Sequence, residues 1–273
     1  MNTSPKAIAT KILSVITGKI GFRSPEFETY DDAFEYCCQK TSDCYESSLL
    51  SQYKFEKFSN FLKDNGNLFS SPSANLLLFS ISLFLRKEGA GVPRLIDFGG
   101  ACGESIVLLS KIFGDEIFMN SWVCESPKQV KESQKWDFGM RMQFVSDLSH
   151  IINERDIDIF FTSGTIQYLP DPYEPLEEVA VAKVPIVALT RNNFSLNPKI
   201  VAQKSPLSSN GNGQHIGKYG NPSIYYPNIS VKKTKVMDIF LSQGYEVLVD
   251  TSGTASGVYG KENFSGDIVM VKQ

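Results

Sequence analysis

Residues 95–105, LIDFGGACGES, decide the fold of this chain, because they join an apolar run to a glycine-rich turn and the start of a helix. The apolar pair Leu95 and Ile96 is typical of a parallel strand covered on both faces. The glycines leave room for a ligand against the backbone, and a helix over residues 104–111 would direct its free N–H groups at that ligand. The stretch predicts an α/β fold with a nucleotide-like ligand at the turn, although many such turns are purely structural.

A carboxylate follows the next predicted strand. Residues 121–125, SWVCE, form a short apolar run that ends in Glu125, after which Ser126 and Pro127 end the strand and begin a helix. A nucleoside ligand needs an acid about 20 residues beyond the turn to accept hydrogen bonds from the ribose hydroxyls. Glu125 could also be a solvated loop carboxylate, but we favour the ligand role because strand, turn, helix, strand and acid occur in order.

The dinucleotide motif G-x-G-x-x-G is not met, because Ala101 stands where its second glycine would be. The stretch instead resembles motif I of the class I S-adenosylmethionine-dependent methyltransferases, an acid followed by alternating small residues. Only Ala101 departs from the usual glycine. The resemblance implies S-adenosylmethionine as cofactor, bound by Asp97, Gly99, Gly100, Ala101, Gly103 and Glu125.

Two later segments extend the resemblance. A strand over residues 142–145 precedes Asp147, and in similar methyltransferases an acid there meets the adenine amino group. Asp147 is equally suited to cap the following helix, and the two roles are compatible. The fourth strand ends in Ser163 and Gly164, which the resemblance also places among the cofactor-binding residues. Residues 165–172 match the region that lines the cofactor and substrate cleft of those enzymes.

The remaining elements complete one domain. Strands are expected over residues 185–190, 245–249 and 267–271, with a helix over residues 233–243. The resemblance covers residues 91–273 and implies a Rossmann-like class I methyltransferase fold, with seven mostly parallel strands and the last strand antiparallel. A substrate-loop insertion is expected at about residues 192–232, and residues 1–90 form a helical N-terminal extension.

Helices are predicted in this extension over residues 6–17, after a Thr29 cap, and in the apolar stretch 75–85. The last stretch is too short to span a bilayer, so it predicts a buried helix rather than a transmembrane segment. The extension either forms a lid or wall of the substrate pocket or serves packing and dimerisation, so a homodimer is one expected assembly.

The segments 18–45, 97–100, 122–125 and 163–172 together resemble a family of bacterial methyltransferases whose genes lie among those for lipopolysaccharide and O-antigen assembly. The resemblance implies O-methylation of a sugar or sugar-linked intermediate of surface polysaccharide. Two alternatives stay open. One is a small-molecule or N-methyltransferase outside polysaccharide pathways, and the other is a non-catalytic cofactor-binding partner of a glycosyltransferase.

An oxygen acceptor on a sugar needs a general base or a metal. His215 stands in the Asn- and Gly-rich segment 210–220 and is a tentative base, the alternative being an incidental surface loop. Arg191, after the fifth strand, could hold a carboxylate or phosphate of the acceptor. Gln167 and Tyr168 are candidate acceptor contacts, although aromatic residues are more often core.

The charge and the cysteine content of the chain limit which classes of partner it is expected to bind. A formal net charge of -3 argues against a nucleic-acid binder that works by counterion release, so the expected partner is a small-molecule or glycan acceptor. The five cysteines lack the spacing of a zinc site or disulfide framework, which predicts reduced thiols and a cytoplasmic protein. The acids and histidines lack metal-ligand spacing, so no metal is expected.

Overall fold

The computed structural model describes residues 24–41, 48–64, 72–89, 91–251 and 263–273. The predicted helix over residues 6–17 and the cysteine at position 44 lie outside these ranges. No helix among the described residues is long and apolar enough to cross a membrane.

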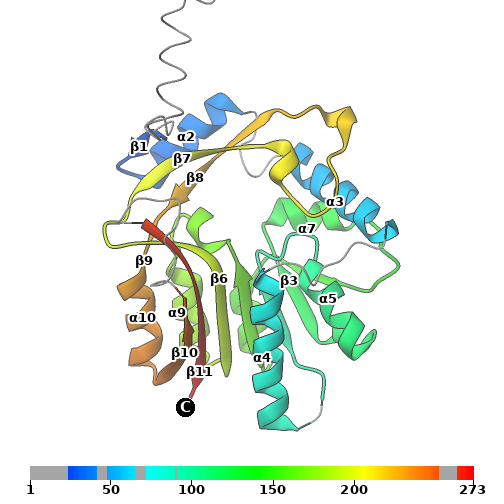
Figure 1. The fold of residues 1–273 in the computed structure, drawn as a ribbon, viewed down its shortest axis with the longest axis vertical. Helices are drawn as coiled ribbons and strands as arrows, with labels where there is room; N and C mark the ends of the chain where they lie inside the picture. The colour runs from blue at the N-terminus through cyan, green and yellow to red at the C-terminus, as the bar shows by residue number, and fades with distance from the viewer. Residues whose placement is uncertain (1–23, 42–47, 65–71, 90, 252–262) are drawn as a thin grey trace, which may run out of the picture.

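A twisted sheet of eight strands forms the centre of the molecule (Figure 1). Its main path runs β10-β11-β6-β5-β2-β3-β4, and the two-residue β9 pairs with the far end of β6. The strands are β2 (Leu95–Phe98), β3 (Ser121–Cys124), β4 (Gln143–Val145), β5 (Ile159–Ser163), β6 (Ile186–Ser195), β9 (Val231–Lys232), β10 (Tyr245–Asp250) and β11 (Asn263–Lys272).

The pairing within this sheet identifies the fold. β2 pairs in parallel with β3 and β5, while β11 lies antiparallel to both β6 and β10. The sheet is therefore of the Rossmann-like class I methyltransferase type, with seven strands in the main path and the last strand antiparallel between the fifth and the sixth. This fold class was predicted from the sequence, and the topology confirms it.

Helices cover both faces of the sheet. One apolar core contains side chains of α3 (Ser48–Lys63), α4 (Pro72–Glu88) and α5 (Glu104–Phe113), and the other contains side chains of α8 (Leu148–Glu154), α9 (Glu174–Val181) and α10 (Lys233–Ser242). Burial of the α4 side chains Leu77, Ile81 and Phe84 confirms the buried apolar helix. Two short helices complete this part of the chain, α6 (Glu116–Met119) and α7 (Pro127–Ser133).

Segments far apart in the sequence build a cap over the carboxyl ends of the strands. β1 (Glu26–Phe27), β7 (Ile200–Pro206) and β8 (Ser223–Ile229) form a second sheet, and α2 (Tyr30–Lys40) packs on β7 and β8. These four elements lie together at one end of the molecule (Figure 1). The predicted insertion is thus an ordered hairpin, and the N-terminal extension contributes a strand to it as well as helices.

The cysteines of α2 differ from each other. Cys37 is buried and free, whereas Cys38 is disulfide-bonded. The expectation of reduced thiols is therefore wrong for Cys38. A single disulfide needs no multi-cysteine framework, so the cysteine spacing did not reveal it.

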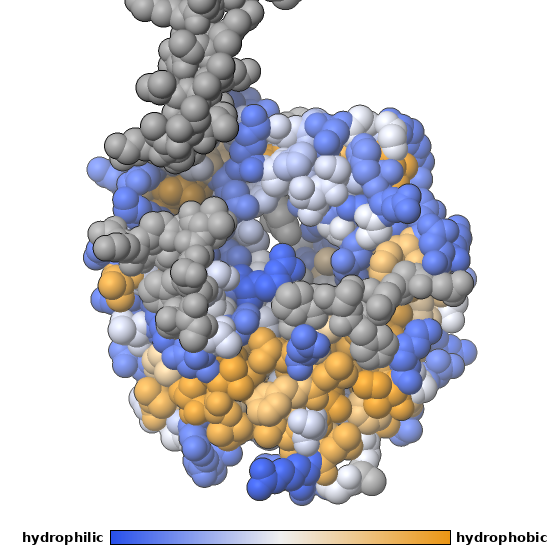
Figure 2. All heavy atoms as spheres, in the orientation of Figure 1, coloured by the Kyte–Doolittle hydropathy of each residue, from blue (hydrophilic) through white to orange (hydrophobic). Residues whose placement is uncertain are grey.

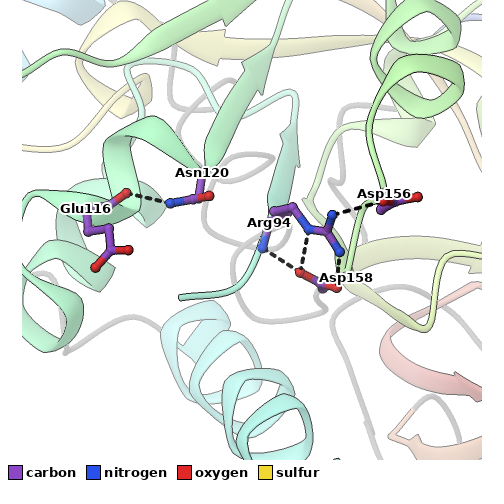
Figure 3. Close-up of polar contacts among 5 residues, drawn as sticks. All are labelled: Arg94, Glu116, Asn120, Asp156 and Asp158. Carbon is purple, nitrogen blue, oxygen red and sulfur yellow. Dashed lines mark hydrogen bonds and ion pairs between the residues drawn. The ribbon is translucent and has the colours of Figure 1, made fainter. Parts of the chain in front are cut away.

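An ion pair fixes the starts of the two central strands. The Arg94 backbone N–H donates to Asp158 Oδ2 at 2.8 Å, and its guanidinium holds both Asp158 oxygens at 3.2 Å (Figure 3). The guanidinium also reaches Asp156 at 3.2 Å. The hydrogen bonds to Asp158 raise the pKa of Arg94. Because these residues precede β2 and β5, the pair sets the relative register of the strands that carry the turn.

The end of α9 offers a test of backbone strain. Lys183 follows this helix with φ +57°, a left-handed conformation that favours glycine, and its side chain is exposed. We expect Lys183→Gly to raise the free energy of unfolding by about 0.5–1 kcal/mol, measured by urea denaturation. Lys183→Ala removes the charge but keeps Cβ, and it should change little. Equal stabilisation by both variants would contradict the strain argument.

Candidate functional site

The turn after β2 lies where the strand order reverses. From β2 the chain continues to β3 on one side, and β5 pairs on the other side, so the carboxyl end of β2 opens between them. Open α/β sheets bind ligands at this switch point. On the face shown in Figure 2, a hollow bordered by hydrophilic side chains lies beneath the cap, and a continuous apolar area extends over the half where α4 and β11 lie.

A buried acid lies under the glycine turn. Asp97 is 2% exposed, and its Oδ2 has no hydrogen-bond partner among the described residues. A Cβ on Gly100 would lie 2.4 Å from Asp97 Cγ, so the carboxyl group folds into space that only glycine leaves. Burial raises the pKa of Asp97 to about 7, the Ser105 hydroxyl opposes this rise, and the charges of Glu104 and Glu125 add to it.

Two further carboxylates hold the backbone of the turn. Glu125 Oε1 accepts a hydrogen bond from Ala101 N at 3.0 Å, and its Oε2 accepts one from Ser126 N at 3.0 Å. Glu104 Oε2 accepts from Cys102 N at 3.0 Å. Burial raises the pKa of Glu104. The N–H groups of the turn just before α5 are thus partly satisfied by carboxylates of the chain itself.

Ala101 has φ +51°, a left-handed conformation that favours glycine. A left-handed alanine costs about 1–2 kcal/mol relative to the right-handed region. The hydrogen bond from its N–H to Glu125 helps to hold this conformation. Gly103 also has a positive φ, +84°, and a Cβ there would lie 2.4 Å from Met142 Sδ, so this glycine is required by packing behind the turn.

Two adjoining cavities open at these carboxylates. The Glu125 cavity has a volume of about 510 Å³, and the Asp97 cavity has a volume of about 690 Å³. Residues of the turn, the segment after β5, the cap and α3 line both of them, namely Lys54, Gly99, Thr165, Tyr168 and Tyr226. The cavities therefore form one continuous site that crosses the turn.

The cap closes the Glu125 cavity. Tyr30, Asp31 and Phe34 of α2 line it, together with Ser146 and Leu148 after β4. The Tyr30 hydroxyl donates to Tyr168 O at 2.8 Å, and the Tyr168 and Tyr226 rings meet edge to face at 5.1 Å. Sequence reasoning did not predict these α2 residues, because the packing of α2 on the hairpin is a long-range contact.

A β-bulge places Arg191 in the wall of the Asp97 cavity. The register between β6 and β11 shifts at this point, Arg191 has φ +57°, and its N–H donates to Asp267 Oδ1 at 2.7 Å. Gln167 is buried, and its amide donates to Arg191 O at 3.3 Å. Bulges beside functional sites redirect side chains in this way, and the strain marks Arg191 as a candidate functional residue.

The other predicted residues are placed as follows. Gly99, Gly100, Ala101, Ser163 and Gly164 line the Asp97 cavity, with the Ser163 hydroxyl 2.8 Å from that of Ser73. Asp147 accepts from His150 N at 2.9 Å and caps α8, one of its two predicted roles. Its neighbours on either side line the Glu125 cavity, whereas Asp147 itself is not among the lining residues.

His215 lies away from both cavities. Its imidazole is exposed, and Nδ1 is 2.9 Å from the hydroxyl of Tyr53, a residue of α3. Neither residue lines the Asp97 or the Glu125 cavity. The structure therefore does not bring the tentative base together with Arg191, Tyr168 and the turn. Among the residues with described positions, no group of three or more His, Cys, Asp or Glu side chains forms a metal site.

Helix α3 fastens the loop at the tip of the hairpin. Lys57 is buried and donates to the carbonyls of Ser208, Asn210 and Gly211 at 2.8, 3.0 and 2.9 Å. Burial lowers the pKa of Lys57. Asn212 Nδ2 then reaches Glu104 Oε1 at 3.3 Å, which connects the loop to the glycine turn. Residues 209–212 line the Asp97 cavity, so Lys57 positions part of its wall.

We expect Lys57→Met to release this loop, because three carbonyls lose their common donor. The free energy of unfolding should fall by about 1–3 kcal/mol. Amide hydrogen exchange should accelerate in residues 208–213 but not in the glycine turn. Lys63→Met, at the exposed end of the same helix, is the control. Unchanged exchange in the loop would show that Lys57 does not anchor it.

Neither a protein-family model nor a curated protein matches this chain. Solved structures with a similar fold include an S-adenosylmethionine-dependent methyltransferase from Clostridium acetobutylicum ATCC 824, at 10% identity and TM-score 0.49, covering 80% of this chain and 98% of that one. The CcbJ methyltransferase from Streptomyces caelestis is similar at 10% identity and TM-score 0.48, covering 82% and 99%. The sugar N-methyltransferase KedS8 from Streptoalloteichus sp ATCC 53650 is similar at 13% identity and TM-score 0.46, covering 79% and 92%. These likenesses are too distant to assign an activity to this chain.

Proposed function

We propose that this chain is an S-adenosylmethionine-dependent methyltransferase. The observation that carries the proposal is the buried Asp97 Oδ2 at the glycine turn, which has no hydrogen-bond partner in the part of the chain that the structure describes. The ammonium group of an amino acid would donate a charge-assisted hydrogen bond to such an oxygen. Glu125 follows the neighbouring strand and lines the cavity, a position at which a carboxylate accepts hydrogen bonds from the ribose hydroxyls of a nucleoside. Together these acids fit both ends of a nucleoside that carries an amino acid.

The bound cofactor would supply a methyl group on a sulfonium. Asp97 would hold the ammonium, and Glu125 would exchange its bond to the Ala101 N–H for bonds to the ribose. Tyr30 and Phe34 of the cap would exclude water from the nucleoside. Transfer then depends mainly on the alignment of the acceptor, which is the role left to the Asp97 cavity and its wall.

The acceptor we propose is a sugar or sugar-linked intermediate of surface polysaccharide, methylated on oxygen. Polar side chains support it, because hydroxyl and amide groups line much of the Asp97 cavity and suit a polyhydroxylated ligand, namely Ser163, Thr165, Gln203, Ser205, Ser209, Asn210 and Asn212. Arg191 would hold a carboxylate or phosphate of this acceptor. His215 can act as the base only if it leaves Tyr53 and turns into the cavity.

Calorimetric titration tests the cofactor directly. We expect S-adenosylmethionine and S-adenosylhomocysteine to bind and NAD not to bind. Glu125→Ala should weaken binding by about 10- to 100-fold, which is the loss of affinity expected when a charged hydrogen-bond acceptor is removed. Glu154→Ala, an exposed acid on α8, is the matched control and should leave binding unchanged.

Each outcome separates the candidate functions. If neither sulfur compound binds, the methyltransferase proposal is wrong and the turn is structural. Binding with methylation of amines rather than glycans would favour the N-methyltransferase. Binding without turnover on any acceptor would favour the non-catalytic partner of a glycosyltransferase.

The affinity for S-adenosylhomocysteine should depend on pH through Asp97. An ammonium prefers the ionised carboxyl group, whose pKa without ligand is raised to about 7. We therefore expect affinity to rise with pH, about tenfold between pH 6 and pH 8, and then to level off. Asp97→Asn should bind weakly with no such dependence. Affinity that is flat or falls over this range in the natural protein would contradict the role of Asp97.

A further inference from the structure

A buried lysine joins the two cavities. Lys54 lies in α3, is 6% exposed, and lines both the Glu125 cavity and the Asp97 cavity. Its positive charge lowers the pKa of Glu104 and of Cys102, against the larger effect of burial on each. The field of Lys54 therefore reaches the glycine turn. No sequence motif pointed to this lysine, because α3 lies outside the Rossmann-like sheet and is separated from β2 by the helix α4.

The turn itself has little capacity for a further anion. Glu104 occupies the Cys102 N–H, Glu125 occupies the Ala101 N–H, and Asp97 lies buried beneath them. These three carboxylates would repel a carboxylate ligand unless a cation lay nearby. Among the described residues that line the Asp97 cavity, the cations are Lys54 and Arg191.

The two cations occupy different parts of the site. The Arg191 side chain lies beside Gly164, after β5, and lines only the Asp97 cavity. Lys54 extends to both cavities and lies beside Gly211 of the cap loop, near Glu104 of the turn. A ligand that passes from Glu125 over the turn to Asp97 must therefore pass Lys54.

We propose that Lys54 binds the α-carboxylate of the methionine portion of the cofactor while Asp97 binds its ammonium, an inference that rests on the proposed function. One acid and one cation that line the same cavity would then recognise the two charges of the amino acid. This leaves Arg191 for the acceptor.

The packing of α3 makes Lys54 suitable for this role. Phe55 and Phe58, on the same helix, are fully buried in the core that also contains the α5 side chains. Lys57, one turn further on, is held by three loop carbonyls. A cation on a helix fixed at these points loses little freedom when a ligand binds, which raises affinity.

Two ligands that differ by one group test the assignment by calorimetry. S-adenosylhomocysteine carries the α-carboxylate, and its decarboxylated analogue keeps the ammonium but lacks that group. Lys54→Met, which preserves an unbranched buried side chain, should weaken binding of the first by about 10- to 100-fold and of the second by no more than about twofold. Lys54→Arg should recover most of the difference. Arg191→Gln is the matched control with the other cation removed, and circular dichroism and thermal unfolding check that each variant folds.

The outcomes distinguish this inference from the proposed function. Equal losses for both ligands in Lys54→Met overturn the inference, as does a preference for the carboxylate that disappears in Arg191→Gln but persists in Lys54→Met. If the natural protein binds neither ligand, the proposed function is wrong, and this inference, which rests on it, is wrong as well. If the natural protein binds and prefers S-adenosylhomocysteine, the Lys54 variants alone decide the inference.

Discussion

The site depends on a buried carboxyl group that the fold does not neutralise. Asp97 sits at the end of a central strand with an oxygen that lacks a partner among the described residues. Such a group destabilises the fold by about 1–3 kcal/mol, and it lies at the position where a bound ligand would give the oxygen a hydrogen-bond partner. The glycine at position 100 exists for the same reason, since any side chain there would collide with the carboxyl group.

Local sequence patterns predicted the central parallel strands well. A strand, a glycine turn, a helix, a second strand and an acid follow in order along residues 95–125. The antiparallel last strand was implied by the resemblance to class I methyltransferases, and the sheet has it. Glu125 was also predictable, because its position depends only on the end of a neighbouring strand. The caps Thr29, Ser126 and Asp147 were readable for the same local reason.

The cap, and the residues that it adds to the site, could not be predicted from the sequence. β1 pairs with β7 across more than 170 residues, and α2 packs on the hairpin rather than beside α3. No local pattern encodes such pairings, so Tyr30, Phe34 and Lys54 could not be assigned to the site. The left-handed backbone conformation of Arg191 could not be predicted either, because it belongs to a bulge that arises from a register shift between β6 and the last strand. For His215 the structure shows a contact with Tyr53 that the composition of its loop did not reveal, while residues 209–212 of the same loop line the Asp97 cavity.

Helix α3 links the two halves of the site. Lys54 and Lys57 are three residues apart, so they lie on neighbouring parts of one helical face. Lys57 holds the carbonyls of residues 208, 210 and 211, and Asn212 of the same loop bonds to Glu104 at the turn. A carboxylate at Lys54 would thus adjoin the loop that shapes the acceptor wall. Because these contacts share one helix and one loop, the residues proposed to hold the cofactor and the wall proposed for the acceptor are supported by the same helix.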